Sequence, residues 1–434
     1  MSQADTLVIG GGLIGVLTAC ELAIRGARVT VLEKDDVGFE QSSRSVGAIN
    51  LPGGTPNPEV SLLRASAELW EAFQDRWGHD IGLNRDGWNI VIANDRDHEW
   101  LETERATWHA TAGYPECELL DAETARERFP QLEGDLIALD ARHGGHVDAV
   151  QVMDSIRLTA ERLGVDVRCG EMATGFDLQG DCVTAVRTRS GRFTPGNVVV
   201  AAGLWSPELA RQLGLHIPMQ RVRAPAVETE PMPPGTIPGF LRASTFGAKQ
   251  SHDGSIRITG GYRFSAMLHD LSLRDVRDLR IWAPAFWQNR KDVSLRLDIA
   301  SLRHEMSAKA ATIRAHNGDI VVPRGQEPRS HPRDRRNQLA GLARLIPAIS
   351  QAKIRRSFSG VMDVIPDLQP VIGRFPDVSN AFLATGFSGH GYMCGPGACQ
   401  AVAETITEGH TEIALHDYQP ERLKEHLKMR DQIF

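Results

Sequence analysis

The sequence is poor in cysteine: its 434 residues include six, and no two of them form a Cys-X-X-Cys pair. This scarcity excludes a disulfide scaffold, argues against a zinc site and favours a reducing compartment, so we expect a cytoplasmic protein without a metal. A basic excess is also lacking, because 48 Lys and Arg stand against 55 Asp and Glu, a formal net charge of −7. Nucleic-acid binding needs a basic face to neutralise phosphates, so we expect no nucleic acid among the partners.

Long apolar runs are missing apart from Leu7 to Ile24, and this run contains four glycines and Glu21. It has neither a basic start nor an obvious cleavage site, so we expect no targeting signal and no integral membrane segment. The composition, 41% hydrophobic and 24% charged, is that of a globular protein and excludes disorder, collagen and coiled coil for most of the chain. The length predicts two or three domains, each able to bury a core.

A glycine-rich turn near the N-terminus predicts a dinucleotide site. The β-rich run at 6–9 is followed by Gly10, Gly12 and Gly15 in the GxGxxG positions, and an apolar helix begins there. The first glycine permits a tight turn, the second lets the backbone approach a pyrophosphate, and the third lets the helix pack against the strand. The helix N-terminus then offers unpaired N–H groups and a positive dipole end to the phosphates.

Polar side chains follow the second predicted strand, at 28–33. Glu33 lies 33 − 10 = 23 positions after Gly10, where a carboxylate can accept a hydrogen bond from a ribose 2′-hydroxyl and would repel a 2′-phosphate. The segment 41–50 then carries several hydroxyls and one arginine. It can wrap further phosphates or a ring system; the alternative is a solvated serine-rich loop.

Two later segments repeat the passage from an apolar strand into glycine. The run 197–202 is continuously apolar, as in a parallel sheet buried on both faces, and it breaks at Gly203 before a helix with Ser206 as N-cap. The strand 381–386 runs into the glycine-rich stretch 387–397 and a further helix. One ligand touched near residues 10, 203 and 390 would be long and buried, and NAD held by the first motif alone would leave the other two unexplained.

The rest of the chain predicts a second domain. Tryptophans cluster between 70 and 108, where core packing and one place in a pocket wall are the alternatives. Alternation at 255–263 predicts an antiparallel sheet. Further expected elements are a helix at 149–163, strands at 165–168 and 183–187, a helix around 273–287, and an exposed Arg-rich loop at 324–336.

Together, the N-terminal motif, VVVAAGLWSPELA (198–210) and ATGFSGHGYM (384–393) resemble the FAD-dependent amine oxidoreductases of the D-amino-acid oxidase superfamily. That group includes sarcosine and glycine oxidases and the catalytic subunits of opine and hydroxyproline dehydrogenases. The resemblance implies an α/β fold with a Rossmann-like FAD-binding domain of the glutathione-reductase type, interleaved with an antiparallel-sheet α+β substrate domain. The FAD-binding domain would comprise 1–52, 148–213 and 355–434, and the substrate domain 53–147 and 214–354.

The resemblance also implies a bound FAD. Sarcosine oxidases carry a flavin-linked cysteine in the stretch that here reads Phe358-Ser359-Gly360-Val361-Met362, and because no cysteine is present we expect a noncovalent cofactor. The implied contacts on the dinucleotide side are Gly10, Gly12, Leu13, Ile14, Gly15, Glu33, Lys34, Ser42, Ser43 and Arg44, with a backbone contact to adenine near Val167. Those on the flavin side are Ala202, Gly203, Trp205, Gly386, Ser388, Gly389, His390, Gly391, Tyr392 and Met393.

The implied reaction is oxidation of a C–N bond in an amino acid or N-substituted amine. Hydride would pass to flavin N5, the imine would hydrolyse, and oxygen or another acceptor would take the electrons. Expected substrate contacts are Tyr262, Tyr392 and Arg257, the last as a carboxylate ligand. His390 is a candidate base, the alternative being that it shapes its loop.

Two departures from sarcosine oxidases bear on the substrate and the acceptor. Met393 stands where those oxidases have a lysine that holds the substrate carboxylate, and Arg257 stands where the oxygen-activating lysine would align. A simple sarcosine-like substrate is therefore not implied, and a dehydrogenase with another acceptor fits as well as an oxidase.

Three alternatives remain. A 2-hydroxy-acid dehydrogenase of the same superfamily would use the same cofactor site. A flavin-binding subunit of a hetero-oligomer would leave the chemistry to a partner, for which the 324–336 loop leaves room. An NAD-only dehydrogenase would leave the C-terminal glycine-rich loop without a role. A homo-oligomer is also open.

Overall fold

The structure is a computed structural model. It describes residues 4–50, 61–92, 118–134, 137–141, 144–243, 246–260, 268–269, 278, 281–283, 320, 324–325, 330 and 332–424. Tyr262 and most of the helix expected around 273–287 lie outside these residues.

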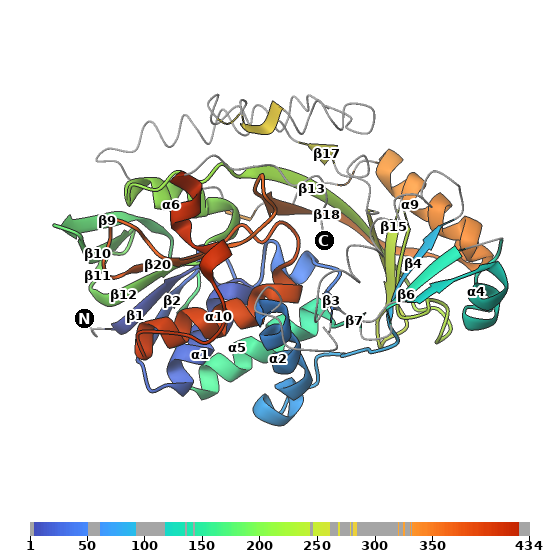
Figure 1. The fold of residues 1–434 in the computed structure, drawn as a ribbon, viewed down its shortest axis with the longest axis horizontal. Helices are drawn as coiled ribbons and strands as arrows, with labels where there is room; N and C mark the ends of the chain where they lie inside the picture. The colour runs from blue at the N-terminus through green and yellow to red at the C-terminus, as the bar shows by residue number, and fades with distance from the viewer. Residues whose placement is uncertain are drawn as a thin grey trace.

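A six-stranded sheet forms the part of the molecule that contains the N-terminal motif (Figure 1). Its strands pair in parallel except for the antiparallel edge pair β19–β20. In spatial order they are β19 (Val371–Arg374), β20 (Ala381–Thr385), β12 (Pro195–Val200), β1 (Ala4–Ile9), β2 (Val29–Leu32) and β8 (Asp166–Arg168).

Both faces of the central strands of this sheet are buried, which explains why β1, β2 and β20 are mostly apolar, whereas the edge strand β8 is exposed and charged. Val8 and Val199 belong to a core shared with helices, whereas Leu7 and Val198, one position earlier on each strand, belong to a second core on the opposite face. The first face carries α1 (Leu13–Ile24), α2 (Ser61–Trp77), α5 (Ala149–Arg162) and α10 (Gly391–Thr407). The second carries α6 (Ser206–Gln212) and a three-stranded sheet of β9 (Ala173–Gln179), β10 (Cys182–Thr188) and β11 (Arg192–Phe193).

A larger sheet forms the other half and is antiparallel, as expected, except for one parallel pair between β4 and β14. Its strands are β17 (Leu268–His269), β13 (Gln220–Thr229), β16 (Ile256–Gly260), β15 (Phe246–Gln250), β14 (Phe240–Arg242), β4 (Trp88–Ile92), β6 (Ile137–Ala141) and β5 (Glu118–Leu120). The long strand β18 (Ile354–Val364) pairs with β13. The helices α4 (Ala122–Arg128) and α9 (Pro332–Leu345) lie at this end of the molecule (Figure 1).

The interleaved division into domains stays a prediction, and two elements depart from its boundaries. The strand β18 pairs with β13 of the large sheet, although its residues fall almost entirely in the segment assigned to the FAD-binding domain. The helix α2, assigned to the substrate domain, packs against α10 in the core of the six-stranded sheet. The strand β18 and the helix α2 contact segments that are distant in the sequence, and the local pattern of apolar and polar residues does not predict such contacts.

Two local expectations need correction. The loop expected at 324–336 gives way to helix at Pro332, where proline is well suited to the first helical turn. Ser206 is not an N-cap, because the 3₁₀ turn Gly203–Trp205 leads directly into α6 and leaves Ser206 with helical backbone angles. Trp205 is the N-cap instead.

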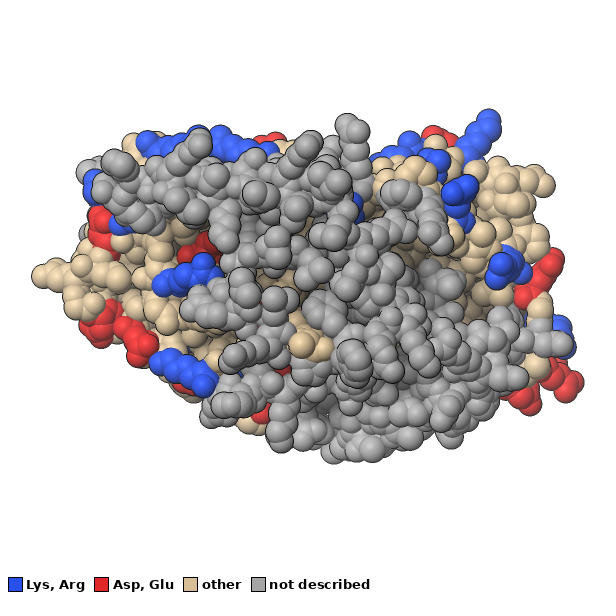
Figure 2. Space-filling view, turned by 90° about the horizontal axis from the view of Figure 1, so that it is seen from above, with Lys and Arg blue, Asp and Glu red and all other residues tan. Residues whose placement is uncertain are grey.

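The described surface carries charges of both signs. In Figure 2, Lys and Arg side chains lie beside Asp and Glu at both ends of the described face. Within the described residues, no helix is both long enough and apolar enough to cross a membrane.

The close contact between α1 and the first turn gives a stability prediction. A Cβ on Gly15 would lie 1.9 Å from the carbonyl oxygen of Gly10, so Gly15→Ala must displace backbone. We expect it to lower the free energy of unfolding by about 3 kcal/mol or more. Gly26→Ala is the control: it meets no atom within 4 Å, and its φ of +86° should cost only about 1 kcal/mol. Urea unfolding compares the two, and equal losses would contradict the packing argument.

Candidate functional site

A cavity of about 330 Å³ lies between the two sheets. Its wall includes the residues that follow β1, β2, β8, β12 and β20, the five parallel strands whose carboxyl ends meet at one edge of the six-stranded sheet. Ligands of open α/β sheets bind at this edge. The segments near residues 10, 203 and 390 therefore line one cavity, as the sequence predicts.

The glycine turn between β1 and α1 is shaped for a close ligand. Gly10 has a φ of +116°, and a Cβ there would lie 2.3 Å from the carbonyl oxygen of Ala201. Gly12 is the N-cap of α1, and a Cβ there would reach to 3.0 Å from Ser42 Oγ. With Leu13 and Ile14, both glycines line the cavity, so side chains larger than hydrogen would fill the place where the helix N-terminus opens. These features fit a dinucleotide pyrophosphate.

Glu33 supplies a buried acceptor at the end of β2. Its Oε2 accepts from Gly11 N at 2.6 Å and its Oε1 from Asp35 N at 2.7 Å. Burial raises the pKa of this carboxyl, while the two backbone N–H groups act in the opposite direction. An acceptor fixed in this way in the cavity wall fits the hydroxyls of a ribose.

Lys34 lines the cavity, but its charge is already compensated. Its Nζ lies 2.7 Å from Glu40 Oε1, and it also pairs with Asp35. Glu40 in turn accepts from Trp205 Nε1 at 3.1 Å, and the Arg221 guanidinium lies 4.1 Å from the centre of the Trp205 ring. This network fixes Trp205 in the wall.

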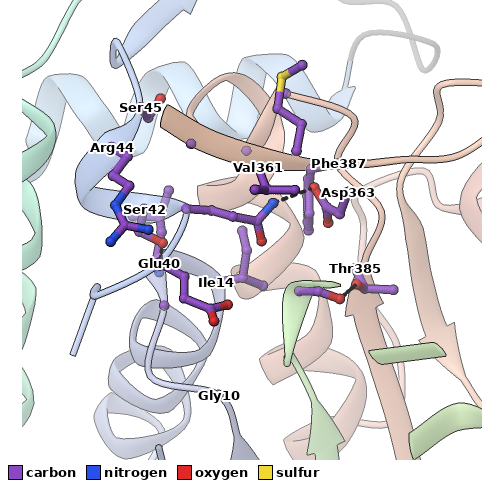
Figure 3. A pocket seen from close by; sticks show the side chains of 18 of the residues that line it. Gly10, Ile14, Glu40, Ser42, Arg44, Ser45, Val361, Asp363, Thr385 and Phe387 are labelled. Atoms are coloured by element: carbon purple, nitrogen blue, oxygen red, sulfur yellow. Dashed lines mark hydrogen bonds between the residues drawn. The ribbon is translucent and has the colours of Figure 1, made fainter. Parts of the chain in front are cut away.

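The 42–45 segment joins the helix N-terminus to the cavity. Ser42 Oγ accepts from Leu13 N at 2.9 Å, and the Arg44 guanidinium lies 5.1 Å from the centre of the Phe39 ring. Ser42, Arg44 and Ser45 line the cavity, as Figure 3 shows from close by.

Four of the expected cofactor contacts lie behind the wall rather than in it: Gly15, Ser43, Val167 and Gly386. Gly15 faces the turn at Gly10, and Ser43 turns its carbonyl to Arg257. The adenine contact expected near Val167 stays a prediction: Val167 sits within β8, and the residues 171–173 that follow this strand line the cavity. Gly386 donates its N–H to Asp363 Oδ2 at 2.9 Å.

The loop before α10 brings His390 into the cavity. Gly389 has a φ of +92°, and a Cβ there would lie 3.0 Å from the Met362 sulfur. His390 is the N-cap of α10 and is partly buried; burial and the nearby Arg242 charge lower the pKa of its imidazole to about 4. Its ring is therefore neutral near pH 7. Ala202, Gly203, Ser388, Gly391 and Met393 also line the cavity.

Tyr392 lines the cavity but uses its hydroxyl for structure. The hydroxyl lies 3.0 Å from the Ser42 carbonyl oxygen and 3.3 Å from that of Ala149, and the ring stacks on Trp70 with centres 5.9 Å apart. Burial raises the pKa of the phenol. The Tyr392 hydroxyl, which the sequence analysis assigned to substrate binding, instead bridges the backbone segments at Ser42 and Ala149.

Arg257 is also corrected as a substrate ligand. Its side chain is buried between Glu228, whose Oε2 lies 3.0 Å from Nη2, and the Ser45 carbonyl oxygen, 2.6 Å from Nη1. It does not appear in the cavity wall. On the neighbouring strand, Lys249 is buried as well, donates to Val147 O at 2.6 Å, and has its pKa lowered by burial to about 7. The two cations join the large sheet to the segments 43–45 and 147–148.

The wall contributed by the large sheet holds residues that the sequence did not single out. Arg242 and Phe240 from β14 and Trp88 from β4 line it, and the Arg242 guanidinium lies 5.9 Å from the centre of the Trp88 ring. The parallel pairing of β4 with β14 places Phe240 opposite Trp88 across 152 positions of chain (240 − 88 = 152). Only the tryptophan cluster was a signal for this wall.

Gln41 and Asp363 were missed as well. Both line the cavity, and Gln41 Nε2 donates to Asp363 Oδ1 at 3.1 Å. Among the described residues, no group of three or more His, Cys, Asp or Glu could hold a metal ion.

Comparison with known families decides the assignment. The family model described as "FAD dependent oxidoreductase" matches residues 5–405. The chain belongs to this family. The cofactor is therefore FAD, and the cavity has the glycine turn, acceptor carboxylate and helix N-termini that this cofactor needs.

The relatives named by the comparisons act on amines. The chain is 25% identical to the mitochondrial dimethylglycine dehydrogenase of Rattus norvegicus over 97% of its own length and 45% of the relative. It thus spans less than half of that protein. It is 27% identical to an opine oxidase subunit of Agrobacterium tumefaciens, covering 65% of this chain and 81% of the relative. The structure of L-amino acid deaminase from Proteus vulgaris superposes with a TM-score of 0.83 at 20% identity, covering 97% of both chains, which shows a shared fold.

Glu33 gives a prediction for cofactor affinity. Glu33→Gln would turn an amide NH₂ toward one of the two backbone N–H donors, of Gly11 or of Asp35, that now have a carboxylate oxygen as acceptor. We expect the FAD dissociation constant to rise about tenfold to a hundredfold, which is about 1.4–2.7 kcal/mol. Titration of the apoprotein with FAD measures this change. Asp166→Asn on β8, an exposed residue paired with Arg168, is the control; the same loss in both variants would count against a specific role for Glu33.

Proposed function

We propose that this chain oxidises a C–N bond of an amino acid or N-substituted amine with noncovalent FAD. The observation that supports the proposal is a single cavity that extends from the Gly10 turn to the wall formed by Trp88, Phe240 and Arg242. One end has the groups that suit a dinucleotide, and the other combines an arginine with aromatic side chains. The names of the relatives, which mention dimethylglycine, an opine and L-amino acids, agree with this interpretation.

The residues that would hold FAD come from all three segments: Gly10, Gly12, Leu13, Ile14, Glu33, Ser42, Arg44, Ala202, Gly203, Trp205 and the 388–393 loop. Bound FAD supplies the hydride acceptor for the carbon next to nitrogen, and water then hydrolyses the imine. The protein's own task is to orient the substrate and to shape the electrostatics around it.

Arg242 is our candidate for binding a substrate carboxylate. A guanidinium recognises a carboxylate through two parallel hydrogen bonds. The strands β4, β13, β14 and β16 contribute one charged residue to the described cavity wall, and this residue is Arg242. Trp88 and Phe240 beside it are apolar surfaces that exclude water from the reacting carbon and can contact an N-alkyl group.

His390 contributes through its neutral state. Because burial and Arg242 lower the pKa of its imidazole, no second cation stands beside the amine at neutral pH. The imidazole therefore adds no positive charge that would repel the amine substrate as it binds. The neutral form of this amine is the hydride donor.

A second proposal concerns assembly. Two relatives are named as parts of larger enzymes, one as a subunit of an opine oxidase and the other as the beta chain of a sarcosine oxidase. These names favour a chain that works as one member of a hetero-oligomer. If so, the isolated chain would bind FAD and would need a partner for full turnover.

The carboxylate role of Arg242 gives a prediction for substrate binding. Arg242→Met should raise the KM of an N-methyl amino acid about tenfold to a hundredfold, because a charged hydrogen-bonded pair is lost, and should barely change that of the matching amine without carboxylate. Steady-state kinetics with both substrates measure the difference. The control is Arg157→Met on the outer face of α5, where Arg157 pairs with Glu161.

The same substrates test the reaction class when flavin bleaching is followed without oxygen. N-alkyl amino acids should bleach the flavin of the wild-type chain and 2-hydroxy acids should not. Bleaching by hydroxy acids alone would replace the proposal by the hydroxy-acid alternative. An unchanged KM in Arg242→Met would remove Arg242 from the carboxylate site.

A further inference from the structure

Asp363, next to the last residue of β18, is a buried carboxylate in the cavity wall, held by two other segments. Its Oδ2 accepts from Gly386 N at 2.9 Å. Its Oδ1 accepts from Gln41 Nε2 at 3.1 Å, a hydrogen bond drawn in Figure 3. Gly386 opens the loop that leads to α10, and Gln41 lies in the segment after β2. One side chain therefore joins two of the three segments assigned to the cofactor.

The third segment completes a ring of contacts. Thr385 Oγ1 donates to the Gly203 carbonyl oxygen at 3.2 Å, also visible in Figure 3. A Cβ on Gly203, whose φ is +48°, would lie 2.4 Å from Gln41 Oε1, so the Gln41 amide packs directly over this glycine. The ring runs from Asp363 to Gln41, over Gly203 to Thr385, and through Gly386 back to Asp363. Each of the four segments in this ring contributes a residue to the cavity wall: Gln41, Gly203, Asp363 and Thr385.

Backbone contacts strengthen the same junction. Ser388 N donates to the Asp363 carbonyl oxygen at 3.3 Å, and Ser388 Oγ accepts from Ile365 N at 3.2 Å. Ser388 has a φ of +52°, which a non-glycine residue rarely adopts without such support. The end of β18 thus holds residues 386–388 in a strained form directly before the N-terminus of α10.

A carboxylate is a costly choice for this place. Burial raises the pKa of Asp363, and the N–H groups of Gln41 and Gly386 offset only part of this rise. An asparagine could make the same two contacts without a charge, once Gln41 turned its amide oxygen inward. Compared with asparagine, aspartate adds a negative charge to the part of the cavity wall where we place the flavin.

We propose that Asp363 positions the 386–391 loop against the Gln41 segment and, as a carboxylate, keeps the reduction potential of the bound flavin low. The inference rests on the proposed placement of the flavin ring beside residues 386–393. Reduction adds negative charge to the cofactor, and a fixed carboxylate nearby opposes it through the low-dielectric wall. The amine substrate must then be a strong enough hydride donor, and the electron acceptor can be a weak oxidant.

Two substitutions separate the charge from the geometry. Asp363→Asn keeps an acceptor for Gly386 N and, once the Gln41 amide turns, a hydrogen bond to Gln41, but it removes the charge. We expect an FAD dissociation constant within about threefold of wild type and a midpoint potential raised by about 30 mV, the equivalent of tenfold for a two-electron couple. Asp363→Ala leaves the Gly386 N–H and the Gln41 amide without this acceptor, and we expect the FAD dissociation constant to rise about tenfold or more. The potential is measured by slow anaerobic reduction against a reference dye, so no amine substrate is needed.

Asp377→Asn is the matched control, since it removes one negative charge from an exposed carboxylate paired with Lys424, away from the cavity wall. It should change neither quantity. A potential that stays at the wild-type value in Asp363→Asn would overturn the electrostatic role, and wild-type FAD affinity in Asp363→Ala would overturn the positioning role. Either failure would leave the proposed amine oxidation standing, whereas a shifted potential without any bleaching by amines would contradict the proposed function alone.

Discussion

The parallel pairing of β1 with two strands from distant parts of the chain is the constraint on which the site depends. In this register Ile9 lies opposite Leu32 of β2 on one side and opposite Val200 of β12 on the other. The chain therefore leaves all three strands at the same edge, and the Gly10 turn, Glu33 and the 201–203 segment enter one wall. The pairing of Val200 with Leu383 brings the loop before α10 to the same place.

The second half of the molecule closes this edge from the other side. The strands β13 and β18 extend from the large sheet to the cavity, and Asp363 near the end of β18 contacts both the Gln41 segment and the loop that begins at Gly386. Two buried cations, Lys249 and Arg257, reach from the same sheet to backbone carbonyls of the first half. Because a buried charge is costly unless it is paired and hydrogen-bonded, these contacts also fix how the two halves meet.

Local patterns were sufficient for the dinucleotide half of the site. The turn at Gly10, the carboxylate at Glu33 and the apolar strand before Gly203 each follow from a few neighbouring residues, because glycine conformation and two-sided burial leave local traces. The helix at 149–163 was expected from its periodicity and observed at Ala149–Arg162. The expectation of a loop through 336 was wrong, since Arg335 and Arg336 lie on the first turns of α9.

The half of the cavity that we propose for the substrate could not be predicted in the same way. Arg242 and Trp88 lie close together because their strands, β14 and β4, pair although they are far apart in the sequence. A local sequence pattern does not predict such a pairing. Arg257 has the right charge and strand, but Glu228 on the adjacent strand takes its guanidinium, and a sequence does not show which of several arginines finds a buried partner. The adenine contact expected near Val167 stays a prediction: the strand β8 was recognised, and the residues that follow it line the cavity.

The most direct test of the convergence of three segments on one cofactor is the flavin content of the purified chain. The account predicts a visible flavin spectrum and close to one FAD per chain, released into solution when the protein is denatured, since no covalent link is expected. A colourless chain whose spectrum stays unchanged after incubation with FAD would contradict it.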